Sequence, residues 1–187
     1  SSPDAQAVLE GEIYRPGIDW SSLTYDFAQE SWTTTTAASV PRNYHSIALL
    51  LPNGLVLTAG SNINGSSGGD GVKEYRIEIY SPWYDGNAYR PRIISAPSQL
   101  GYAEEFFVSY SKSAAIRRAA LIRCGSMTHA WDGDQRYIAL EFHEHAAGVL
   151  SITSPPQGRI APPGPYLLWI IDSSGRPCRR AHFVTLN

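Results

Sequence analysis

The stretch PRNYHSIALLLPNGLVLTAG, residues 41–60, decides the fold. Two apolar runs, residues 46–51 and 55–59, flank the turn Pro52-Asn53-Gly54. Asn-Gly between apolar runs is a strong hairpin signal, because both residues accept the positive φ that a tight turn requires. The first run is apolar at every position from 47 to 51, which indicates a strand that is covered on both faces. Stacked blades of a β-propeller provide that environment, so we predict a blade here.

A short internal repeat surrounds this hairpin. The sequence EIYRP at residues 12–16 is echoed by EIYSP at residues 78–82, and each copy reads as a strand that runs into a proline-marked loop. Trp32 and the spacing Arg42-x-x-His45 lie between the copies, in the order typical of a kelch-type blade. We therefore predict that residues 1–90 form a kelch-type β-propeller blade segment. One blade cannot bury its faces alone.

The second half of the chain shows a different β pattern. Short apolar segments punctuated by turn residues are predicted to start near Ile93, Phe106, Ala119, Tyr137, Val149, Tyr166 and Phe183. Seven strands in about 95 residues is the pattern of an immunoglobulin-like β-sandwich. We therefore predict an all-β chain, in which residues 91–187 form the sandwich. Its most apolar run, residues 166–171, reads as a central buried strand, with Trp169 packed in the core.

Charge and hydropathy exclude several classes of partner. The formal net charge is −2, and Lys and Arg are scattered without a basic stripe, so we expect no nucleic acid partner. No apolar run reaches the roughly 18 residues that span a bilayer, so we expect no membrane span. The chain starts Ser1-Ser2-Pro3-Asp4 without a methionine or a signal-peptide core, and we expect it to be processed, trimmed or cut from a larger protein.

Two features bear on the compartment. Cys124 and Cys178 are the only cysteines, and they could form a disulfide across two sheets or could both be buried and reduced. The sequon Asn64-Gly65-Ser66 lies in a Gly/Ser-rich loop, which would suit glycosylation of a secreted protein.

Two segments resemble one enzyme family. The first is residues 41–46, Pro-Arg-Asn-Tyr-His-Ser, followed by the hairpin. The second is residues 120–129, ALIRCGSMTH, followed by Asp134-Gln135-Arg136. Together they resemble the last propeller segment and the early-set domain of copper-radical oxidases of the galactose oxidase and glyoxal oxidase type. The similarity continues to the end of the chain, so the chain resembles the C-terminal part of such a secreted, extracellular enzyme.

The resemblance implies a role for three residues. Tyr44 would be the axial copper ligand and proton acceptor, and His45 and His129 would be equatorial ligands. Imidazole nitrogens and oxygen donors suit the tetragonal preference of Cu(II). In the family, a cysteine cross-linked to a second tyrosine stores one electron, and O2 reoxidises the site to give peroxide. Those two residues come from earlier blades, so the resemblance implies a partial copper site and a chain that is inactive alone.

Several alternatives stay open at the level of sequence. The chain could be a glycan-binding or interaction module that descends from the oxidases, or a β-sandwich with no copper history. Partners would be the missing N-terminal blades or a partner chain, and a small alcohol, aldehyde or carbohydrate. Trp131 could line the rim of the site. His143 and His145 share one face of a strand but read as a solvated strand end, and the nucleophile-elbow match at residues 65–69 has no following helix.

Overall fold

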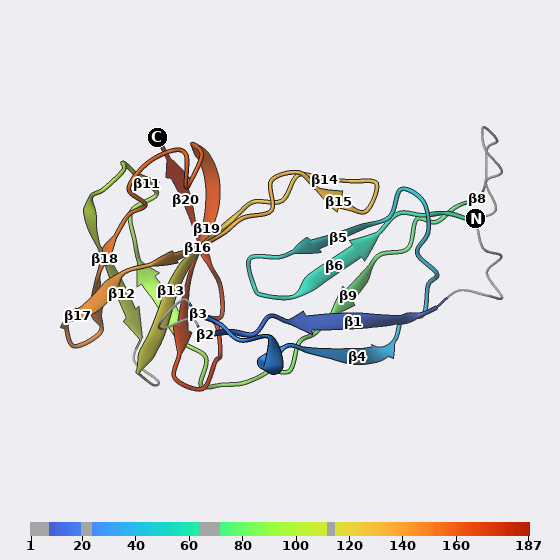
Figure 1. Ribbon diagram of the computed structural model, residues 1–187, viewed down its shortest axis with the longest axis horizontal. Coiled ribbons are helices and arrows are strands. Elements are labelled where there is room, and N and C mark those ends of the chain that lie inside the picture. Colours follow the sequence, from blue (N-terminus) through green and yellow to red (C-terminus); the bar gives the residue numbers. More distant parts are fainter. Residues whose placement is uncertain (1–7, 20–23, 64–71, 112–114) are drawn as a thin grey trace. The chain divides into compact units, whose positions relative to one another are not determined.

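The computed structural model describes residues 8–19, 24–63, 72–111 and 115–187. Over those residues the chain is β-strand, turn and loop, apart from one 3-10 turn, η2 (Phe27–Gln29) (Figure 1). The predicted all-β class is therefore confirmed. Within the described ranges, no helix has the length and apolar character needed to cross a membrane.

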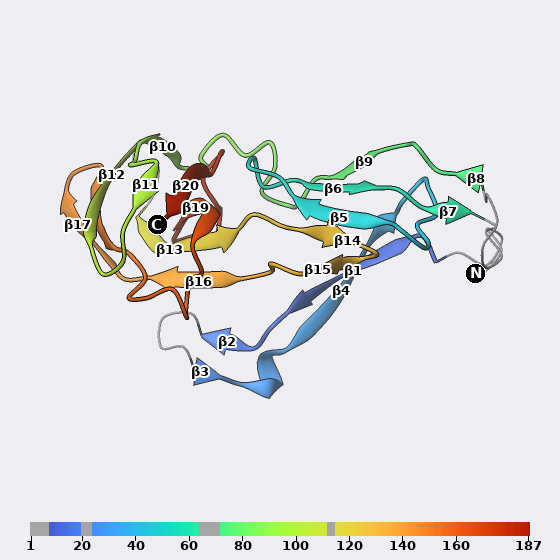
Figure 2. The same cartoon turned by 90° about the horizontal axis from the view of Figure 1, so that it is seen from above.

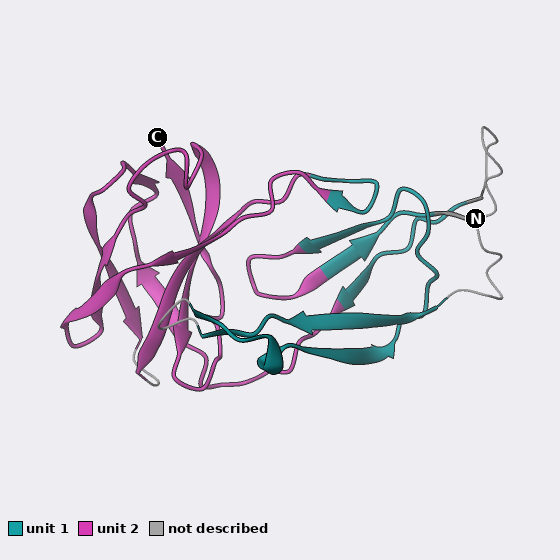
Figure 3. Cartoon of the chain, in the orientation of Figure 1, with its two compact units in different colours: residues 1–49, 57–79, 127–131 teal, residues 50–56, 80–126, 132–187 magenta. Residues whose placement is uncertain are grey.

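The chain separates into two compact units (Figure 3). Unit 1 comprises residues 1–49, 57–79 and 127–131, and unit 2 comprises residues 50–56, 80–126 and 132–187. Each unit thus takes in several segments of the sequence. The predicted division into residues 1–90 and 91–187 has a single boundary, and it stays a prediction.

Unit 2 contains a β-sandwich of two layers (Figure 1, Figure 2). The order in the four-stranded sheet is β10 (Arg92–Ser95), β12 (Glu105–Ser111), β18 (Val149–Thr153) and β17 (Phe142–Ala146). The order in the five-stranded sheet is β11 (Gln99–Leu100), β20 (His182–Leu186), β19 (Gly164–Asp172), β13 (Ile116–Arg123) and β16 (Tyr137–Leu140). All neighbours are antiparallel except β11 and β20, which are parallel.

The alternation of side chains explains the sandwich core. In β12, Phe106, Val108 and Tyr110 are buried, and every second residue between them is more exposed. Successive side chains of a strand point to opposite faces, so one face of this sheet packs inward. In contrast, β19 is buried at most positions, and Trp169 is 3% exposed, as predicted for a central strand. Burying each large apolar side chain contributes about 1.5–3 kcal/mol.

A buried arginine organises one end of unit 2. The Arg90 guanidinium donates hydrogen bonds to the carbonyl oxygens of Pro177 at 3.0 Å, Cys178 at 2.8 Å and Asn53 at 2.9 Å. It also lies 5.0 Å from the centre of the Tyr84 ring. These contacts satisfy the charge inside the protein, which a buried arginine requires. The sequence pattern gave no sign of them.

Both cysteines are free thiols. Cys178 is fully buried in the sandwich, and burial raises the pKa of its thiol to about 11. Cys124 is half-buried, and burial raises its pKa as well. Of the two alternatives left open by the sequence, the structure thus shows the reduced pair.

Thiol labelling distinguishes the two cysteines. At pH 8, about one Cys178 side chain in a thousand would be a thiolate, and the thiolate is the reactive form. We expect a thiol reagent to label Cys124 in the native chain and to spare Cys178 until denaturant is added, as counted by mass spectrometry. Equal labelling rates in the native chain would contradict the burial of Cys178.

Unit 1 contains smaller sheets. Strand β1 (Glu10–Arg15) pairs with β4 (Ser31–Ala37). A three-stranded sheet, which runs to the boundary of the unit, has the order β5 (Ile47–Leu50), β6 (Val56–Ala59) and β9 (Glu78–Tyr80). Two-stranded pairs are β2 (Ile18–Asp19) with β3 (Thr24–Tyr25), β7 (Asn62–Ile63) with β8 (Val72–Lys73), and β14 (Met127–Thr128) with β15 (Trp131–Asp132).

The predicted hairpin is present. Gly54 has a φ of +86°, and its N–H donates to the Leu51 carbonyl at 2.8 Å, which closes the turn between β5 and β6. The repeated EIY sequences form β1 and β9. A propeller blade has four strands, whereas this sheet has three over the described residues, so the kelch-type blade remains a prediction.

Unit 1 has almost no core of its own. Over its described residues, Val40 is the one buried apolar side chain. All six residues of β1 are exposed, as are six of the seven in β4. An isolated two-stranded ribbon is at best marginally stable in water. The large exposed apolar side chains of this unit include Tyr14, Phe27, Trp32, Ile77 and Ile79.

Candidate metal centre

Tyr44 and His45 occupy the middle of a tight turn in unit 1. The Ser46 N–H donates to the Asn43 carbonyl at 3.0 Å, which closes the turn over these two residues. His45 has a φ of +66°, in the left-handed region that few non-glycine residues adopt. Asn43 supports the turn, because its side-chain oxygen accepts the Tyr44 N–H at 2.9 Å. The turn therefore holds both side chains against a local backbone cost.

Two neighbours fix the position of this turn. The Arg42 guanidinium donates to the carbonyl oxygens of Gly60 at 2.9 Å and Thr58 at 3.3 Å, and it pairs with Glu78 at 3.3 Å. Gly60 has a φ of +72°, and a Cβ at this position would lie 2.7 Å from the His45 carbonyl oxygen. The turn therefore packs against the backbone at Gly60, directly after β6. A residue with a side chain at position 60 would not leave room for this contact.

His129 lies in the connection between β14 and β15, also within unit 1. It has a φ of +51°, and Ala130 follows with a φ of +60°. The Ala130 N–H donates to the Ser46 carbonyl at 2.8 Å, which joins this connection to the turn that carries His45. Both histidines therefore stand in an uncommon backbone conformation. Such local strain gathers at functional sites.

The structure brings the three predicted residues together. The ring centres of Tyr44 and His45 lie 3.9 Å apart, those of His45 and His129 lie 4.3 Å apart, and those of Tyr44 and His129 lie 5.4 Å apart. The cluster joins residues that are 84 positions apart in sequence, from 45 to 129. All three side chains are exposed to solvent in this chain.

The cluster fits a metal that accepts imidazole and phenol donors. A metal lies about 2.0 Å from an imidazole nitrogen. Two imidazoles whose nitrogens bind one ion at an N–metal–N angle of about 90° therefore have ring centres roughly 4.4 Å apart. The observed separation of 4.3 Å is compatible with that arrangement. Two imidazoles with an oxygen donor are a set that Cu(II) accepts.

Thr128 orients the His129 ring. Its Oγ1 lies 2.6 Å from Nδ1 of His129. When Nδ1 carries the proton and donates it to Thr128, the lone pair of Nε2 is left available for a metal. A hydrogen bond of this kind fixes the tautomer and the ring plane of a ligating histidine.

Removing the Thr128 hydroxyl tests this arrangement. We expect Thr128→Val, which keeps the side-chain volume, to lower the affinity of the site for Cu(II) by about 10–100-fold, the usual effect of losing such a partner. Thr128→Ser keeps the hydroxyl and should retain near-native affinity, as measured by competition with a chelator. An equal loss in both variants would show that packing, and not the hydrogen bond, sets the affinity.

The base of the β14–β15 hairpin is closed in unit 2. The Asp132 carboxylate accepts the N–H groups of Ser126 and Asp134, both at 3.0 Å. Arg123 pairs with Asp134 at 3.0 Å and donates to the Pro162 carbonyl at 2.9 Å. Asp134 belongs to the Asp-Gln-Arg sequence noted above, which the structure thus places at the base of this hairpin.

The other candidates add no second centre. Trp131 lies in β15 and is 70% exposed, and its place at the rim of the site remains a prediction. His143 and His145 lie on β17, both exposed. Over the described ranges, no group of three or more His, Cys, Asp and Glu side chains could hold a metal. The sequon at Asn64 and the glycine-rich residues 65–69 lie outside the described residues.

Three supporting residues had no assigned role at the level of sequence. Thr128 contacts the His129 ring through its hydroxyl. Gly60 lets the His45 turn approach closely, and the Asp132 carboxylate accepts the Ser126 N–H. The Arg42-x-x-His45 spacing was the one local signal that pointed to a supporting residue.

Comparison with known proteins decides the family. The family model of the galactose oxidase-like early set domain matches residues 90–186, slightly more than half of the chain. The chain belongs to the galactose oxidase-like family. The resemblance stated from the two sequence segments is therefore confirmed.

Curated members of this family align with most of the chain. An aldehyde oxidase, GLOX, from Vitis pseudoreticulata is 34% identical over 152 residues, which are 74% of this chain and 29% of that protein. A galactose oxidase from Gibberella zeae is 31% identical over 187 residues, which are 94% of this chain and 27% of that protein. The galactose oxidase-like chain thus spans between a quarter and a third of the length of these relatives.

A solved structure shows the same fold. It is a fungal alcohol oxidase of the AA5 family in complex with copper, and it superposes on the galactose oxidase-like chain with a TM-score of 0.74 at 29% identity. The match covers 87% of this chain and 34% of that one.

Proposed function

We propose that this chain is the C-terminal segment of an extracellular copper-radical oxidase that oxidises primary alcohols or aldehydes with O2. In this proposal Tyr44, His45 and His129 would hold the copper, Tyr44 through its phenol oxygen and the two histidines through imidazole nitrogen. The observation that carries the proposal is the convergence of these three rings, with both histidines at positive φ. Relatives whose names specify galactose or aldehyde oxidation support the reaction class.

The chain's own residues would perform binding and proton handling. The two imidazoles hold the metal through nitrogen, and Thr128 keeps the His129 ring in the tautomer that leaves Nε2 available. The Tyr44 oxygen accepts the proton of the substrate hydroxyl and holds it beside the site. Copper, when bound, would supply the redox centre of the reaction. For an alcohol the overall reaction balances as RCH2OH + O2 → RCHO + H2O2.

The chain is proposed to act only with further blades of the same enzyme. The Cys-Tyr radical cofactor of the family is expected in those blades, because in the family its cysteine and tyrosine come from earlier blades. The near absence of a core in unit 1 supports this dependence, since exposed apolar surface of this extent marks an interface. Exposure of all three ring side chains further supports it, because water competes for an open site and loosens its geometry.

The experiment compares the 187-residue chain with the product of its whole gene, both supplied with copper. We expect the longer protein to release H2O2 with a primary alcohol or an aldehyde, and the chain alone to release none. Peroxide from the chain alone would refute the proposal that the chain acts only with further blades. Failure of the longer protein to bind copper would refute the oxidase proposal itself.

A second candidate function is carbohydrate binding by unit 1 without catalysis. An exposed aromatic cluster favours it, since Tyr14 and Trp32 have ring centres 4.7 Å apart and Tyr25 and Phe27 have ring centres 4.6 Å apart. Flat exposed rings suit sugar faces. A glycan array with Trp32→Ala and Trp131→Ala variants separates the two functions, because this candidate predicts binding that requires Trp32 and is indifferent to copper.

A further inference from the structure

A buried indole N–H in unit 2 has no hydrogen-bond acceptor. Trp169 is 3% exposed, and its Nε1 has no partner among the described residues. Buried donors in native proteins are nearly always paired, and an unpaired one calls for an explanation. Trp169 belongs to unit 2, whereas Tyr44, His45 and His129 belong to unit 1.

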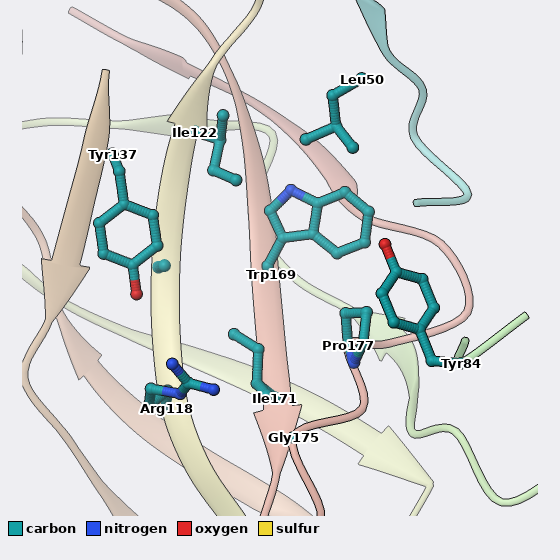
Figure 4. Close-up of a pocket in the computed structure, with 10 residues that line it drawn as sticks. Leu50, Tyr84, Arg118, Ile122, Tyr137, Trp169, Ile171, Gly175 and Pro177 are labelled. Carbon is teal, nitrogen blue, oxygen red and sulfur yellow. The ribbon is translucent and has the colours of Figure 1, made fainter. Parts of the chain in front are cut away.

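The indole borders a cavity on the five-stranded sheet. Ala120 pairs with Trp169 across β13 and β19, and Ile122 pairs with Tyr137 across β13 and β16, so these four residues share one face of the sheet. The cavity has a volume of about 210 Å³, and Leu50, Tyr84 and Pro177 also line it (Figure 4). Its walls are largely apolar.

Among the described residues, no acceptor forms a hydrogen bond with Nε1. Figure 4 shows the indole nitrogen turned toward the side chains of Ile122 and Leu50, which carry only carbon. The Tyr84 hydroxyl donates its proton to the Gly54 carbonyl at 2.6 Å and makes no hydrogen bond with Nε1. No acidic side chain lines the cavity, and Arg118 is its one charged residue.

We propose that this cavity is a docking point for the part of the longer polypeptide that the chain lacks. The occupant is a chain segment that inserts one apolar side chain and presents a main-chain carbonyl oxygen to Nε1 of Trp169. The inference rests on the proposed function, in which further blades exist. It is supported by the relatives, of which the chain spans only 27–29%.

The size of the cavity favours a side chain over a free ligand. Pockets for small molecules usually occupy about 300–1,000 Å³, whereas this one has about 210 Å³. An apolar lining with one donor matches what a buried interface between protein segments provides. A neutral carbonyl satisfies the indole without bringing an unpaired charge into the sheet.

The test observes the Trp169 indole directly. The 187-residue chain and the product of its whole gene are labelled with ¹⁵N-tryptophan, and the Trp169 signal is assigned from Trp169→Phe. In the longer protein we expect this N–H to move downfield, as for an N–H bonded to a carbonyl, and to exchange with solvent at least about 100-fold more slowly. Trp131→Phe, at an exposed position, is the matched control and should leave the Trp169 signal unchanged.

The outcomes separate this inference from the proposed function. An unchanged Trp169 signal in a longer protein that binds copper overturns the docking point and leaves the oxidase intact. A shifted and protected signal in a longer protein that binds no copper supports the docking point and overturns the oxidase. Protection that depends on the concentration of the chain alone would identify a second copy as the occupant and overturn the inference. A gene that encodes no further chain would overturn it as well.

Discussion

We expect copper affinity to fall by at least about 100-fold when His129 is replaced by alanine in the product of the whole gene, a larger loss than that of a supporting partner. The reason is that His129 supplies one of only two imidazoles in the cluster, and its ring centre lies 4.3 Å from that of His45. The measurement is competition with a chelator at fixed pH, together with an assay for the proposed release of H2O2.

His143→Ala is the matched control for this substitution. His143 is an exposed histidine on β17 and lies in the other unit, so its loss should change neither copper affinity nor turnover. Equal losses in the two variants would show that copper binds nonspecifically to surface imidazoles. An unchanged affinity in His129→Ala would remove His129 from the site.

Gly60→Ala should disrupt the same centre without touching a ligand. Any L-residue with a side chain in the left-handed region costs roughly 1–2 kcal/mol. At position 60 the new Cβ also lies 2.7 Å from the His45 carbonyl oxygen, so the turn that carries Tyr44 and His45 must move. We expect copper affinity to fall by at least about tenfold, because a site that is held loosely loses its geometry.

Gly86→Ala is the control that measures only the cost of a non-glycine residue at positive φ. Gly86 has a φ of +73°, close to the +72° of Gly60, but a Cβ there would meet nothing within 4 Å. This variant should show the loss of stability in urea unfolding and keep its copper affinity. If Gly86→Ala lost as much affinity as Gly60→Ala, general destabilisation and not displacement of the His45 turn would be the cause.

The sequence predicted those features that rest on local pattern. Asn53-Gly54 between apolar runs specified the β5–β6 hairpin, because the turn residues and the runs are adjacent in the chain. The seven predicted strands of the sandwich followed from apolar segments and turn residues in the same way, and each begins within three residues of its predicted start. The prediction missed β11 and β17, which bring the two sheets to four and five strands. The pairing of His45 with His129 was within reach only because both segments resembled one family.

The features that were missed depend on contacts through space. Nothing near Arg90 in sequence shows that it reaches the carbonyl oxygens of Pro177 and Cys178. The positive φ of His45 and His129 could likewise not be predicted, because most non-glycine residues avoid the left-handed region. All six residues of β1 are exposed, which the repeated EIY pattern did not indicate.

The most direct test of the account is electron paramagnetic resonance, with copper analysis, on the product of the whole gene and on its variants. We predict one bound copper per chain, with a Cu(II) spectrum that shows coupling to imidazole nitrogen and weakens in both His45→Ala and His129→Ala. Protein that contains no copper, or a copper spectrum that is unchanged in both variants, would contradict the assignment of Tyr44, His45 and His129 as a copper centre.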